Sequence, residues 1–451
     1  MPLMAPPSRD ALVLGGGISG LTTAFLLARR GMQVTVLEAA PRVGGAMETL
    51  ADGPWRFEMG PNTVLEGNAD VTALISACGL DGEKITATPS AKKRFLWKGG
   101  RLLSLPGGPG GFFRTPLFSL GAKLRLLREP WIPRPDGAEG QIPEETIGSF
   151  VRRRLGHEFL DYAVGPFVSG VYAGDPDRLS VRWAVPRIFA LESEHGSLIR
   201  GALAKRKGAQ PGGPMISFRE GLDALPRRLA REIGDVRTGV FCHGIRRSGS
   251  LFVAETGDGP VEAERLVLAV PADVASRLLD ELTGGASRLF AEIPYAPVAV
   301  VSLGVRREDV AHPLDGFGFL VPRKEGLNVL GCLFPSTLFP GRAPEGHAAL
   351  VAFVGGTTNP EIVTRRDEVI YTTVREELGR ALGLRGEPVF HHVRRWPRAI
   401  PQYELGHGRF VARAEEIERS FPGLRISGNF LRGLSVPDCI RNATALAAEI
   451  Q

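Results

Sequence analysis

Residues 11–45 begin with Ala11-Leu-Val-Leu-Gly-Gly-Gly-Ile-Ser-Gly-Leu and end with Val36-Leu-Glu-Ala-Ala-Pro-Arg-Val-Gly-Gly, and this stretch decides the fold. The apolar run 11–14 predicts a buried parallel strand. Three glycines follow it with the spacing G-x-G-x-x-G, and a predicted helix continues to residue 30. Residues 32–37 predict a second strand, with Glu38 at its end. A strand, a glycine turn, a helix and a strand in this order predict a nucleotide-binding unit.

Each glycine of the first turn has its own physical task. Gly15 permits the tight bend, Gly17 lets the backbone approach a pyrophosphate, and Gly20 allows the helix to pack closely on the strand. The free N–H groups and the positive dipole end of the helix favour a phosphate. Glu38 comes about 20 residues after the turn, where a carboxylate accepts hydrogen bonds from an adenosine ribose. That carboxylate would repel a 2′-phosphate, so the sequence argues against NADP.

A second glycine motif, Arg42-Val-Gly-Gly45, comes directly after the second strand, and nicotinamide dehydrogenases do not need it. It resembles the second glycine motif of the large family of FAD-dependent amine oxidases, phytoene desaturases and protoporphyrinogen oxidases. In that family the segment runs along the pyrophosphate towards the flavin ring. The next residue is usually basic there, whereas this chain has Ala46. One phosphate contact is therefore missing or comes from the backbone.

The composition indicates a packed globular protein of two or three domains. The chain has 451 residues, of which 43% are hydrophobic and 23% charged, and this length exceeds one simple core. A net charge of +6 suits ligands that carry carboxylates or an anionic membrane surface. The basic residues are spread along the chain and only 7% of residues are aromatic, so we do not expect nucleic acid as a partner.

The four cysteines, at 78, 242, 332 and 439, have no short mutual spacing. They form neither a metal motif nor a disulfide framework, so we expect free thiols in a reducing cytoplasm and no metal site. No apolar run reaches the roughly 18 residues of a spanning helix. Residues 106–134 place Phe and Leu beside Lys and Arg, which is typical either of a helix in a bilayer interface or of one that packs on its own domain. We expect a cytoplasmic protein whose membrane contact is at most peripheral, on the inner face of the cell membrane.

The rest of the pattern predicts an α/β fold with three domains. A discontinuous Rossmann-like FAD-binding domain comprises residues 8–86, 211–290 and 420–451. A substrate-binding domain at 291–419 contains β-branched and apolar runs that predict a largely antiparallel sheet. A helical, potentially membrane-associating domain is inserted at 87–210. Within it, the run Arg152-Arg-Arg154 is interpreted as a solvated helix face.

Further motifs resemble those of the protoporphyrinogen oxidase family almost from end to end. They are Phe167-Val-Ser-Gly-Val-Tyr-Ala-Gly-Asp-Pro176, His195-Gly-Ser-Leu-Ile199, Gly316-Phe-Gly-Phe-Leu-Val-Pro322, Phe353-Val-Gly-Gly356, Trp396 with Pro401, Tyr403, Gly406 and His407, and the C-terminal Gly428-Asn429 and Pro437-Asp-Cys-Ile440. Amine oxidases share the first and last of these motifs but not the middle ones. The resemblance therefore implies a flavoprotein that acts on a porphyrinogen.

The resemblance implies FAD in an extended pose. The pyrophosphate would lie on the first glycine turn, the ribose on Glu38, the adenine against the backbone around Cys242, and the flavin ring near residues 60–62, Trp396 and Val436. The residues expected to contact the cofactor are Gly15, Gly17, Ile18, Ser19, Gly20, Glu38, Ala39, Arg42, Gly44, Gly45, Ala46, Gly60, Pro61, Asn62, Cys242, Trp396, Gly428, Asn429, Ser435 and Val436.

The resemblance also implies a tetrapyrrole-binding site. Arg94 corresponds to the arginine that pairs with a propionate, and an arginine fork suits a carboxylate. Gly170 corresponds to a position where the backbone passes close to the macrocycle. Leu320, Leu333 and Phe353 correspond to apolar positions that sandwich the pyrrole rings. Hydride removal from a methylene bridge needs the flavin held close in a dry slot, and it needs no metal and no nucleophile, so we assign no catalytic side chain.

The implied reaction is the six-electron oxidation of protoporphyrinogen IX to protoporphyrin IX, with dioxygen as acceptor and release of hydrogen peroxide. The nearest alternative is the same chemistry on coproporphyrinogen III, because both substrates carry propionates. Amine oxidation and carotenoid desaturation are further alternatives. A binding protein like the GDP-dissociation inhibitors, which share this nucleotide fold without flavin, is the alternative from another class. A homodimer and transfer of product to ferrochelatase are additional expectations.

Overall fold

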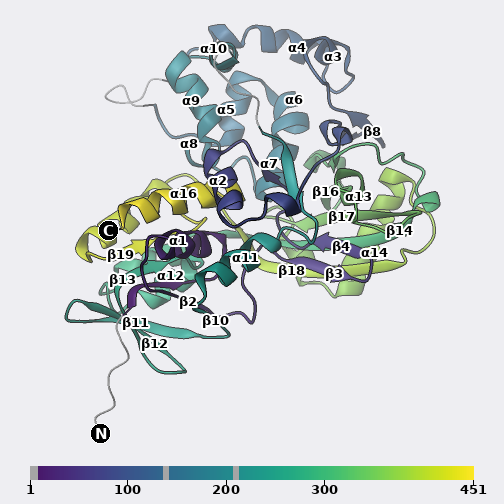
Figure 1. The fold of residues 1–451 in the computed structure, drawn as a ribbon. Coiled ribbons are helices and arrows are strands. Elements are labelled where there is room, and N and C mark those ends of the chain that lie inside the picture. The colour runs from purple at the N-terminus through teal and green to yellow at the C-terminus, as the bar shows by residue number, and fades with distance from the viewer. Residues whose placement is uncertain (1–8, 136–141, 207–212, 451) are drawn as a thin grey trace.

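The computed structural model describes residues 9–135, 142–206 and 213–450 and contains two seven-stranded sheets with helices around them (Figure 1). In Figure 1 the helices of residues 109–206 lie above both sheets, with the first sheet at the lower left and the second at the right. Residues 207–212, at the expected end of the inserted domain, and residue 8, where the FAD-binding domain was expected to begin, lie outside the described residues.

The first sheet confirms the predicted strand, turn, helix and strand. β1 (Arg9–Leu14) lies parallel to β2 (Val34–Glu38) and to β13 (Val261–Leu268), and β2 also pairs with β10 (Val236–Thr238). β19 (Leu424–Ile426) runs parallel to the end of β13. β12 (Leu251–Thr256) and β11 (Cys242–Ser248) extend the sheet as an antiparallel hairpin. Strands from three distant stretches of the chain thus form one Rossmann-like sheet.

Both faces of β1 are buried, as a parallel strand in the centre of a sheet requires. Ala11 and Val13 pack in a core with helices on one face of the sheet, which are α1 (Ile18–Ala28), α2 (Ala69–Ala77), α11 (Ala224–Ile233) and α16 (Val436–Glu449). Leu12 and Leu14 pack on the other face with α12 (Ala272–Leu278) and α15 (Gly408–Ser420). The alternation of side chains along the strand therefore supplies two separate cores.

The second sheet confirms the predicted antiparallel sheet. Its order is β18 (Phe390–Pro401), β14 (Tyr295–Arg306), β17 (His347–Gly355), β16 (Val329–Leu333), β15 (Gly318–Leu320), β7 (Phe95–Lys98) and β8 (Arg101–Ser104). All neighbours are antiparallel except β15 and β7. The β7–β8 hairpin, which the sequence prediction grouped with the helical insertion, thus pairs with the second sheet. The other domain boundaries remain predictions.

The two faces of the second sheet differ in what covers them. α14 (Asp367–Leu382) packs its apolar side chains on one face. The other face contacts the hairpin of β3 (Thr49–Asp52) and β4 (Trp55–Glu58) near β14 and β17, and α7 (Gly165–Tyr172) near β15 and β16. A small sheet of β5 (Val64–Leu65), β9 (Met215–Phe218) and β6 (Lys84–Thr86) and a short helix α13 (Pro335–Leu338) complete this side.

The helical region contains α3 (Pro109–Arg114), α4 (Leu120–Leu127), a turn η3 (Glu129–Trp131), α5 (Ile147–Arg154), α6 (His157–Phe159), a π-helix (Leu160–Val164), α7, α8 (Val181–Ala184), α9 (Pro186–His195) and α10 (Leu198–Arg206). Among the described residues, no helix has both the length and the apolar character that crossing a bilayer demands.

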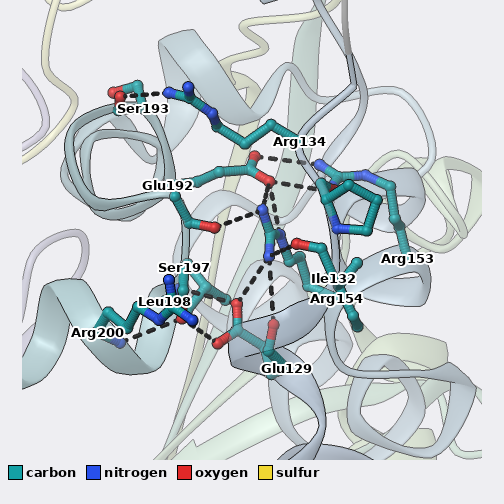
Figure 2. Close-up of polar contacts among 12 residues, drawn as sticks. Glu129, Ile132, Arg134, Arg153, Arg154, Glu192, Ser193, Ser197, Leu198 and Arg200 are labelled. Carbon is teal, nitrogen blue, oxygen red and sulfur yellow. Dashed lines mark hydrogen bonds and ion pairs between the residues drawn. The ribbon is translucent and has the colours of Figure 1, made fainter.

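The prediction that residues 152–154 form a solvated face is wrong for Arg154, whereas Arg152 remains partly exposed. Figure 2 shows Arg154 enclosed by Glu129 and Glu192, and all three side chains are fully buried. Arg154 Nη1 lies 3.2 Å from a Glu129 carboxylate oxygen, and its Nε donates to Glu192. The same Glu129 carboxylate accepts hydrogen bonds from Ser197 Oγ and from the backbone N–H of Leu198 at 2.8 Å. Arg154 is buried because the buried carboxylates of η3 and α9 require a cation between them.

Candidate functional site

The first glycine turn separates into two structural glycines and one that faces open space. A Cβ at Gly15 would lie 2.3 Å from the carbonyl oxygen of Ala269, and a Cβ at Gly20 would lie 2.0 Å from the carbonyl oxygen of Gly15. No atom lies within 4 Å of the position of a Cβ at Gly17. Gly15 and Gly20 therefore allow the strand and helix to approach, while Gly17 leaves room at the start of α1 for a ligand. Ile18 and Ser19 form the first turn of that helix.

Glu38 is fixed at the end of β2 by the backbone. Its Oε2 accepts a hydrogen bond from Gly16 N–H at 2.6 Å, and its Oε1 accepts one from Ala40 N–H at 2.7 Å. The segment after β10 continues the pairing of that strand with β2, because Val240 N–H donates to the Glu38 carbonyl. Cys242 follows at a bulge in β11 with a buried side chain, so only its backbone can contact a ligand. Glu38, Ala39 and Cys242 thus meet at one end of the glycine turn, where the ribose and adenine were expected.

The second glycine motif packs directly against the first. Gly44 N–H donates to the Gly16 carbonyl at 2.8 Å, and Gly17 and Gly44 form a parallel bridge. Both Gly44 and Gly45 have positive φ, at 105° and 57°, which favours glycine. The Arg42 guanidinium donates to the Gly45 carbonyl and to the carboxylate of Glu48, at 2.8 and 2.7 Å. Arg42 therefore supports the loop that borders the open space at Gly17.

Residues 46–62 continue from this loop towards the second sheet. Gly60 packs on Ala46 so closely that a Cβ at position 60 would lie 2.0 Å from the Ala46 carbonyl oxygen. The Asn62 amide donates to the Gly60 carbonyl at 2.9 Å, which fixes the turn around Pro61. Trp396 of β18 donates from its indole Nε1 to the Met59 carbonyl at 2.6 Å. The expected flavin-ring residues 60–62 and Trp396 are thus brought together although they lie more than 330 positions apart.

The C-terminal motif returns to the first sheet beside the glycine turn. Ser427 N–H donates to the Leu268 carbonyl at 2.7 Å. Gly428 has a φ of 133°, and a Cβ at this position would contact Val270 and Phe430. Asn429 follows Gly428 in this loop. Ser435 caps α16 through its Oγ, and Val436 is the buried first residue of that helix. α16 packs on α1, so both helices contribute to the same part of the molecule.

The expected substrate residues share one face of the second sheet. Leu320 pairs with Gly331, and Gly331 pairs with Phe353, so Leu320 and Phe353 point to the same side. Leu333 lies two residues from Gly331 and therefore also points to that side. The register continues through Val300 to Arg394 on β18, two residues from Trp396. The apolar candidates and the expected flavin-ring tryptophan thus face the same space.

α7 packs against the same face of the sheet beside Leu320. A Cβ at Gly170 would lie 2.4 Å from Leu320 Cδ2, so the helix touches the sheet where it carries no side chain. Phe167 and Val171, on the same helix, leave 46% and 48% of their surfaces exposed. Both residues lie in the motif of residues 167–176, but the sequence analysis assigned no substrate contact to either of them. Their exposure next to a glycine that touches the sheet is a signal that appears only in three dimensions.

Arg94 lies at the rim of this face. It precedes Phe95 of β7, and Leu96, two residues on, pairs with Leu320, so Arg94 belongs to the same side of the sheet as Leu320. The side chain is exposed, and its guanidinium carbon lies 5.1 Å from the centre of the Phe317 ring. Among the described residues, no carboxylate forms an ion pair with Arg94. A cation over an aromatic ring at the edge of an apolar face suits an anionic group of a largely apolar ligand.

Sequence reasoning missed a set of charged residues around the cofactor loops. Glu48 forms ion pairs with both Arg42 and Arg394, at 2.7 and 3.0 Å, and the Arg394 guanidinium lies over the Trp396 ring at 4.4 Å from the ring centre. This arrangement joins the second glycine loop to the tryptophan. Glu58 is buried beside Arg342, and desolvation raises its pKa from 4.5 to about 7. Its position one residue before Met59 places a titratable group next to the expected flavin-ring loop.

The remaining chemistry-bearing groups are held in neutral form by burial. Burial raises the pKa of the Cys78 thiol to about 12 and that of Cys439 to about 11, and the four cysteines are free and buried. Burial also lowers the pKa of His407 to about 4. Within residues 9–135, 142–206 and 213–450, no group of three acidic, His or Cys side chains is arranged to hold a metal ion. The arrangement can bind a cofactor and orient an apolar ligand.

The two interlocked glycine loops, the carboxylate at the end of β2 and the open space at Gly17 fit an FAD molecule, and they define the class of the protein as a flavin-dependent oxidoreductase. The chain belongs to the family described as flavin containing amine oxidoreductase, which matches residues 18–451. FAD is its cofactor. When bound, FAD would accept a hydride, which carries two electrons and one proton, from a substrate and pass the two electrons on to an acceptor.

Comparison with known proteins shows which members of this family the chain resembles. The chain is 33% identical to protoporphyrinogen oxidase 1, chloroplastic, of Arabidopsis thaliana, over 98% of this chain and 88% of that protein. It is 28% identical to coproporphyrinogen III oxidase of Bacillus subtilis (strain 168), over 99% of this chain and 98% of that protein. A crystal structure of a candidate protoporphyrinogen oxidase from Exiguobacterium sp. 255-15 is 26% identical, covers 99% of both chains and superimposes with a TM-score of 0.84. A putrescine oxidase at 20% identity and a TM-score of 0.76 shares the fold.

Proposed function

We propose that this flavoenzyme oxidises protoporphyrinogen IX to protoporphyrin IX with dioxygen as acceptor. The observation that carries the proposal is the apolar face of Leu320, Leu333 and Phe353, with Trp396 on the same side and Arg94 at its rim, an arginine that forms no ion pair with any described residue. A tetrapyrrole combines a broad apolar macrocycle with propionate carboxylates, and this face offers contacts to both. The relatives named protoporphyrinogen oxidase, at up to 34% identity, support the same substrate class.

Each residue then has a binding role. Leu320, Leu333 and Phe353 contact one side of the macrocycle, while Phe167 and Val171 of α7 contact the other. The backbone at Gly170, which touches Leu320, passes the edge of the macrocycle. Arg94 binds a propionate and sets the orientation of the ring. Residues 60–62, Trp396, Gly428 and Val436 position the flavin so that a methylene bridge faces it. The apolar walls exclude water from the reacting carbon.

The overall reaction removes six electrons and six hydrogens from the porphyrinogen. Three dioxygen molecules accept them and leave as three molecules of hydrogen peroxide, so electrons and atoms balance. Coproporphyrinogen III is the second candidate substrate, because the Bacillus subtilis relative covers the whole chain and because Arg94 suits a propionate of either compound. Product transfer to a ferrochelatase and a homodimeric state remain proposals.

The test is the growth of porphyrin fluorescence in air with each porphyrinogen at equal concentration. We expect faster growth with protoporphyrinogen IX and about one hydrogen peroxide for every two electrons removed. Faster growth with coproporphyrinogen III would assign the enzyme to that substrate. A yellow protein that gives no growth with either compound would refute the porphyrinogen proposal.

We also propose that this chain contacts the inner face of the cell membrane peripherally, through α4 and the turn after it. Leu120, Leu124 and Leu127 recur at helical spacing and are 72%, 53% and 50% exposed, and Trp131 is 75% exposed. In contrast, Phe112 stacks on Phe159 and packs at a tilt against Phe118, so its replacement would disturb the fold and it is a poor residue for a test. An exposed apolar stripe beside basic residues is typical of helices at bilayer interfaces.

Flotation with anionic liposomes tests this contact. We expect the wild type to float and the variant Leu120→Ser/Leu124→Ser to remain at the bottom of the gradient, with both retaining flavin. A matched control is Leu203→Ser, at an exposed apolar position of α10. Equal flotation of the wild type and the double variant would refute the contact.

A further inference from the structure

The segment 402–407, between β18 and α15, contacts two functional parts of the molecule from adjacent residues. Gln402 Nε2 donates to the carbonyl of Tyr172, the last residue of α7, at 2.9 Å. Tyr403 Oη donates to the carbonyl of Asn429. Gln402 and Tyr403 are 1% and 2% exposed. One side chain therefore reaches the helix with Gly170, and the next reaches the loop with Gly428.

His407 makes a second contact to the same loop. Its Nε2 lies 3.0 Å from the carbonyl of Leu431, and its ring contacts the Tyr403 ring in a tilted arrangement with 4.2 Å between ring centres. A carbonyl can only accept, so Nε2 must carry the proton and Nδ1 the lone pair. Nδ1 has no hydrogen-bond partner among the described residues. A second proton would be buried without an acceptor, so the ring is neutral and its donor is permanently directed at Leu431.

Backbone contacts tie the same segment to the helical region. Ser180 N–H donates to the Tyr403 carbonyl at 2.8 Å, and the Gly406 N–H donates to the carboxylate of Glu144 at 3.0 Å. The segment is thus held on three sides, by β18, by the helical region and by the loop 427–431. A segment held in this way has little freedom to move relative to either part.

We propose that the segment 402–407 sets the distance between the substrate helix α7 and the flavin loop 427–431, with Tyr403 and His407 as positioning residues for the loop and Gln402 as the positioning residue for α7. This inference rests on the proposed function for its substrate side only. Its flavin side requires that the chain binds FAD and that the loop 427–431 contacts the flavin, as expected for Gly428 and Asn429. Loss of the hydrogen bond from Gln402 to α7 should affect substrate binding, whereas loss of those from Tyr403 and His407 to the loop 427–431 should affect FAD binding.

The flavin side is tested on purified holoenzyme by the visible absorption spectrum of the flavin and by FAD release on dilution, followed by flavin fluorescence. Tyr403→Phe removes one oxygen atom, and His407→Leu removes the donor to Leu431. His407→Gln keeps an amide nitrogen that can reach the same carbonyl. We expect about 3- to 10-fold weaker FAD retention and a shifted spectrum for Tyr403→Phe and His407→Leu, since each loses one buried hydrogen bond. We expect His407→Gln to stay within about 2-fold of the wild type.

The control for loss of a tyrosine hydroxyl is Tyr371→Phe, because Tyr371 bonds Glu387 on the far side of the second sheet. It should leave the flavin spectrum and FAD retention unchanged. Wild-type spectra and FAD retention in both Tyr403→Phe and His407→Leu would overturn the flavin side of the proposal. Failure of His407→Gln to restore retention would do the same, since the donor would then not be the relevant feature.

The substrate side is tested with Gln402→Met, which preserves the length of the side chain and removes the donor to Tyr172. We expect KM for the porphyrinogen to rise about 3- to 10-fold with FAD retention unchanged, because α7 moves and the flavin loop does not. A change in FAD retention without a change in KM would overturn this assignment. If the wild type oxidises neither porphyrinogen, the proposed function fails, while the flavin-side measurements still decide the role of Tyr403 and His407.

Discussion

Gly17 and Gly20 are only three residues apart, yet a methyl group would meet very different surroundings at the two positions. At Gly17 it would enter open space, and the backbone φ of −76° is accessible to alanine. At Gly20 it would lie 2.0 Å from the carbonyl oxygen of Gly15. We expect Gly17→Ala to have the urea midpoint of the wild type when no FAD is added. We expect it to bind FAD at least 10-fold more weakly than the wild type, because the methyl group occupies the space for the pyrophosphate.

Gly20→Ala should instead destabilise the protein by about 1–3 kcal/mol, because α1 must move away from β1. Urea unfolding with and without added FAD separates the two effects, since a ligand stabilises only the form that binds it. A loss of stability in Gly17→Ala equal to that in Gly20→Ala would contradict the distinction between a ligand-facing and a packing glycine.

Arg94 offers a residue-scale test of the proposed substrate. Its guanidinium is exposed and lies over Phe317 at the rim of the apolar face. We expect Arg94→Ala to raise KM for protoporphyrinogen IX about 10-fold with kcat within about 2-fold. The charge-assisted hydrogen bond to a propionate stabilises the bound substrate and the transition state equally, so its loss weakens binding alone. Arg101→Ala, on the next strand of the same hairpin, is the matched control. An unchanged KM in Arg94→Ala would show that the propionate binds elsewhere.

At the scale of single elements, α5 contains two sequence patterns that give opposite predictions for Arg154. Ile147, Phe150 and Val151 form its buried apolar stripe, and Arg154 continues the same helical spacing. The spacing therefore places Arg154 on the buried face, although a run of three arginines suggests solvent. Its partners Glu129 and Glu192 lie 25 and 38 positions away, so no local pattern could reveal why an arginine is tolerated there.

Replacement of this buried arginine should be far more costly than replacement of its exposed neighbour. We expect Arg154→Met to lower the free energy of unfolding by about 3–5 kcal/mol, because buried Glu129 loses its cation, Glu192 keeps only Arg153, and the backbone hydrogen bonds of Glu129 at the start of α10 are disturbed. Arg152→Met, which breaks an exposed pair with Asp177, should cost less than about 1 kcal/mol. Chemical unfolding measures both.

The variant Arg154→Met combined with Glu129→Gln and Glu192→Gln provides a further comparison. It removes the unpaired charges along with the arginine, so it should recover part of the lost stability. Equal stability of Arg154→Met and Arg152→Met would contradict the burial of the cluster in Figure 2.

The β1–α1–β2 unit and the antiparallel sheet could be predicted because their signals are local. The glycine spacing, the apolar runs and the position of Glu38 all lie within short stretches of sequence. The assignment of the β7–β8 hairpin could not be predicted, because its partner β15 comes more than 200 residues later. The contact of Trp396 with Met59 spans 337 positions, and that of Tyr403 with Asn429 spans 26, so neither lies within one local pattern. Motif resemblance suggested that these residues matter, and only the fold shows what they touch.

At the scale of the whole molecule, Glu58 lies where several parts of the chain meet. It ends β4, beside the loop expected at the flavin ring, and accepts hydrogen bonds from Thr49 Oγ1 at 2.7 Å and from Leu222 N–H at 3.0 Å. Arg342, from the segment before β17, lies 3.5 Å away. Desolvation raises the pKa of Glu58 from 4.5 to about 7, against the opposing effect of Arg342. The native state therefore holds a proton there that the unfolded chain releases near pH 4.5.

This linkage predicts the sign of a pH dependence. The stability that comes from the protonated Glu58 is fully present below the unfolded pKa of 4.5 and is lost as the pH rises through about 7. Glu58→Gln cannot titrate, so the free energy of unfolding of the wild type minus that of Glu58→Gln should fall by about 2 kcal/mol between pH 5 and pH 8. Urea midpoints at both pH values measure it, with Glu220→Gln, 62% exposed, as the control for loss of one carboxylate. A difference that stays constant or grows with pH would mean that Glu58 is already ionised in the folded protein and that Arg342, rather than a proton, neutralises it.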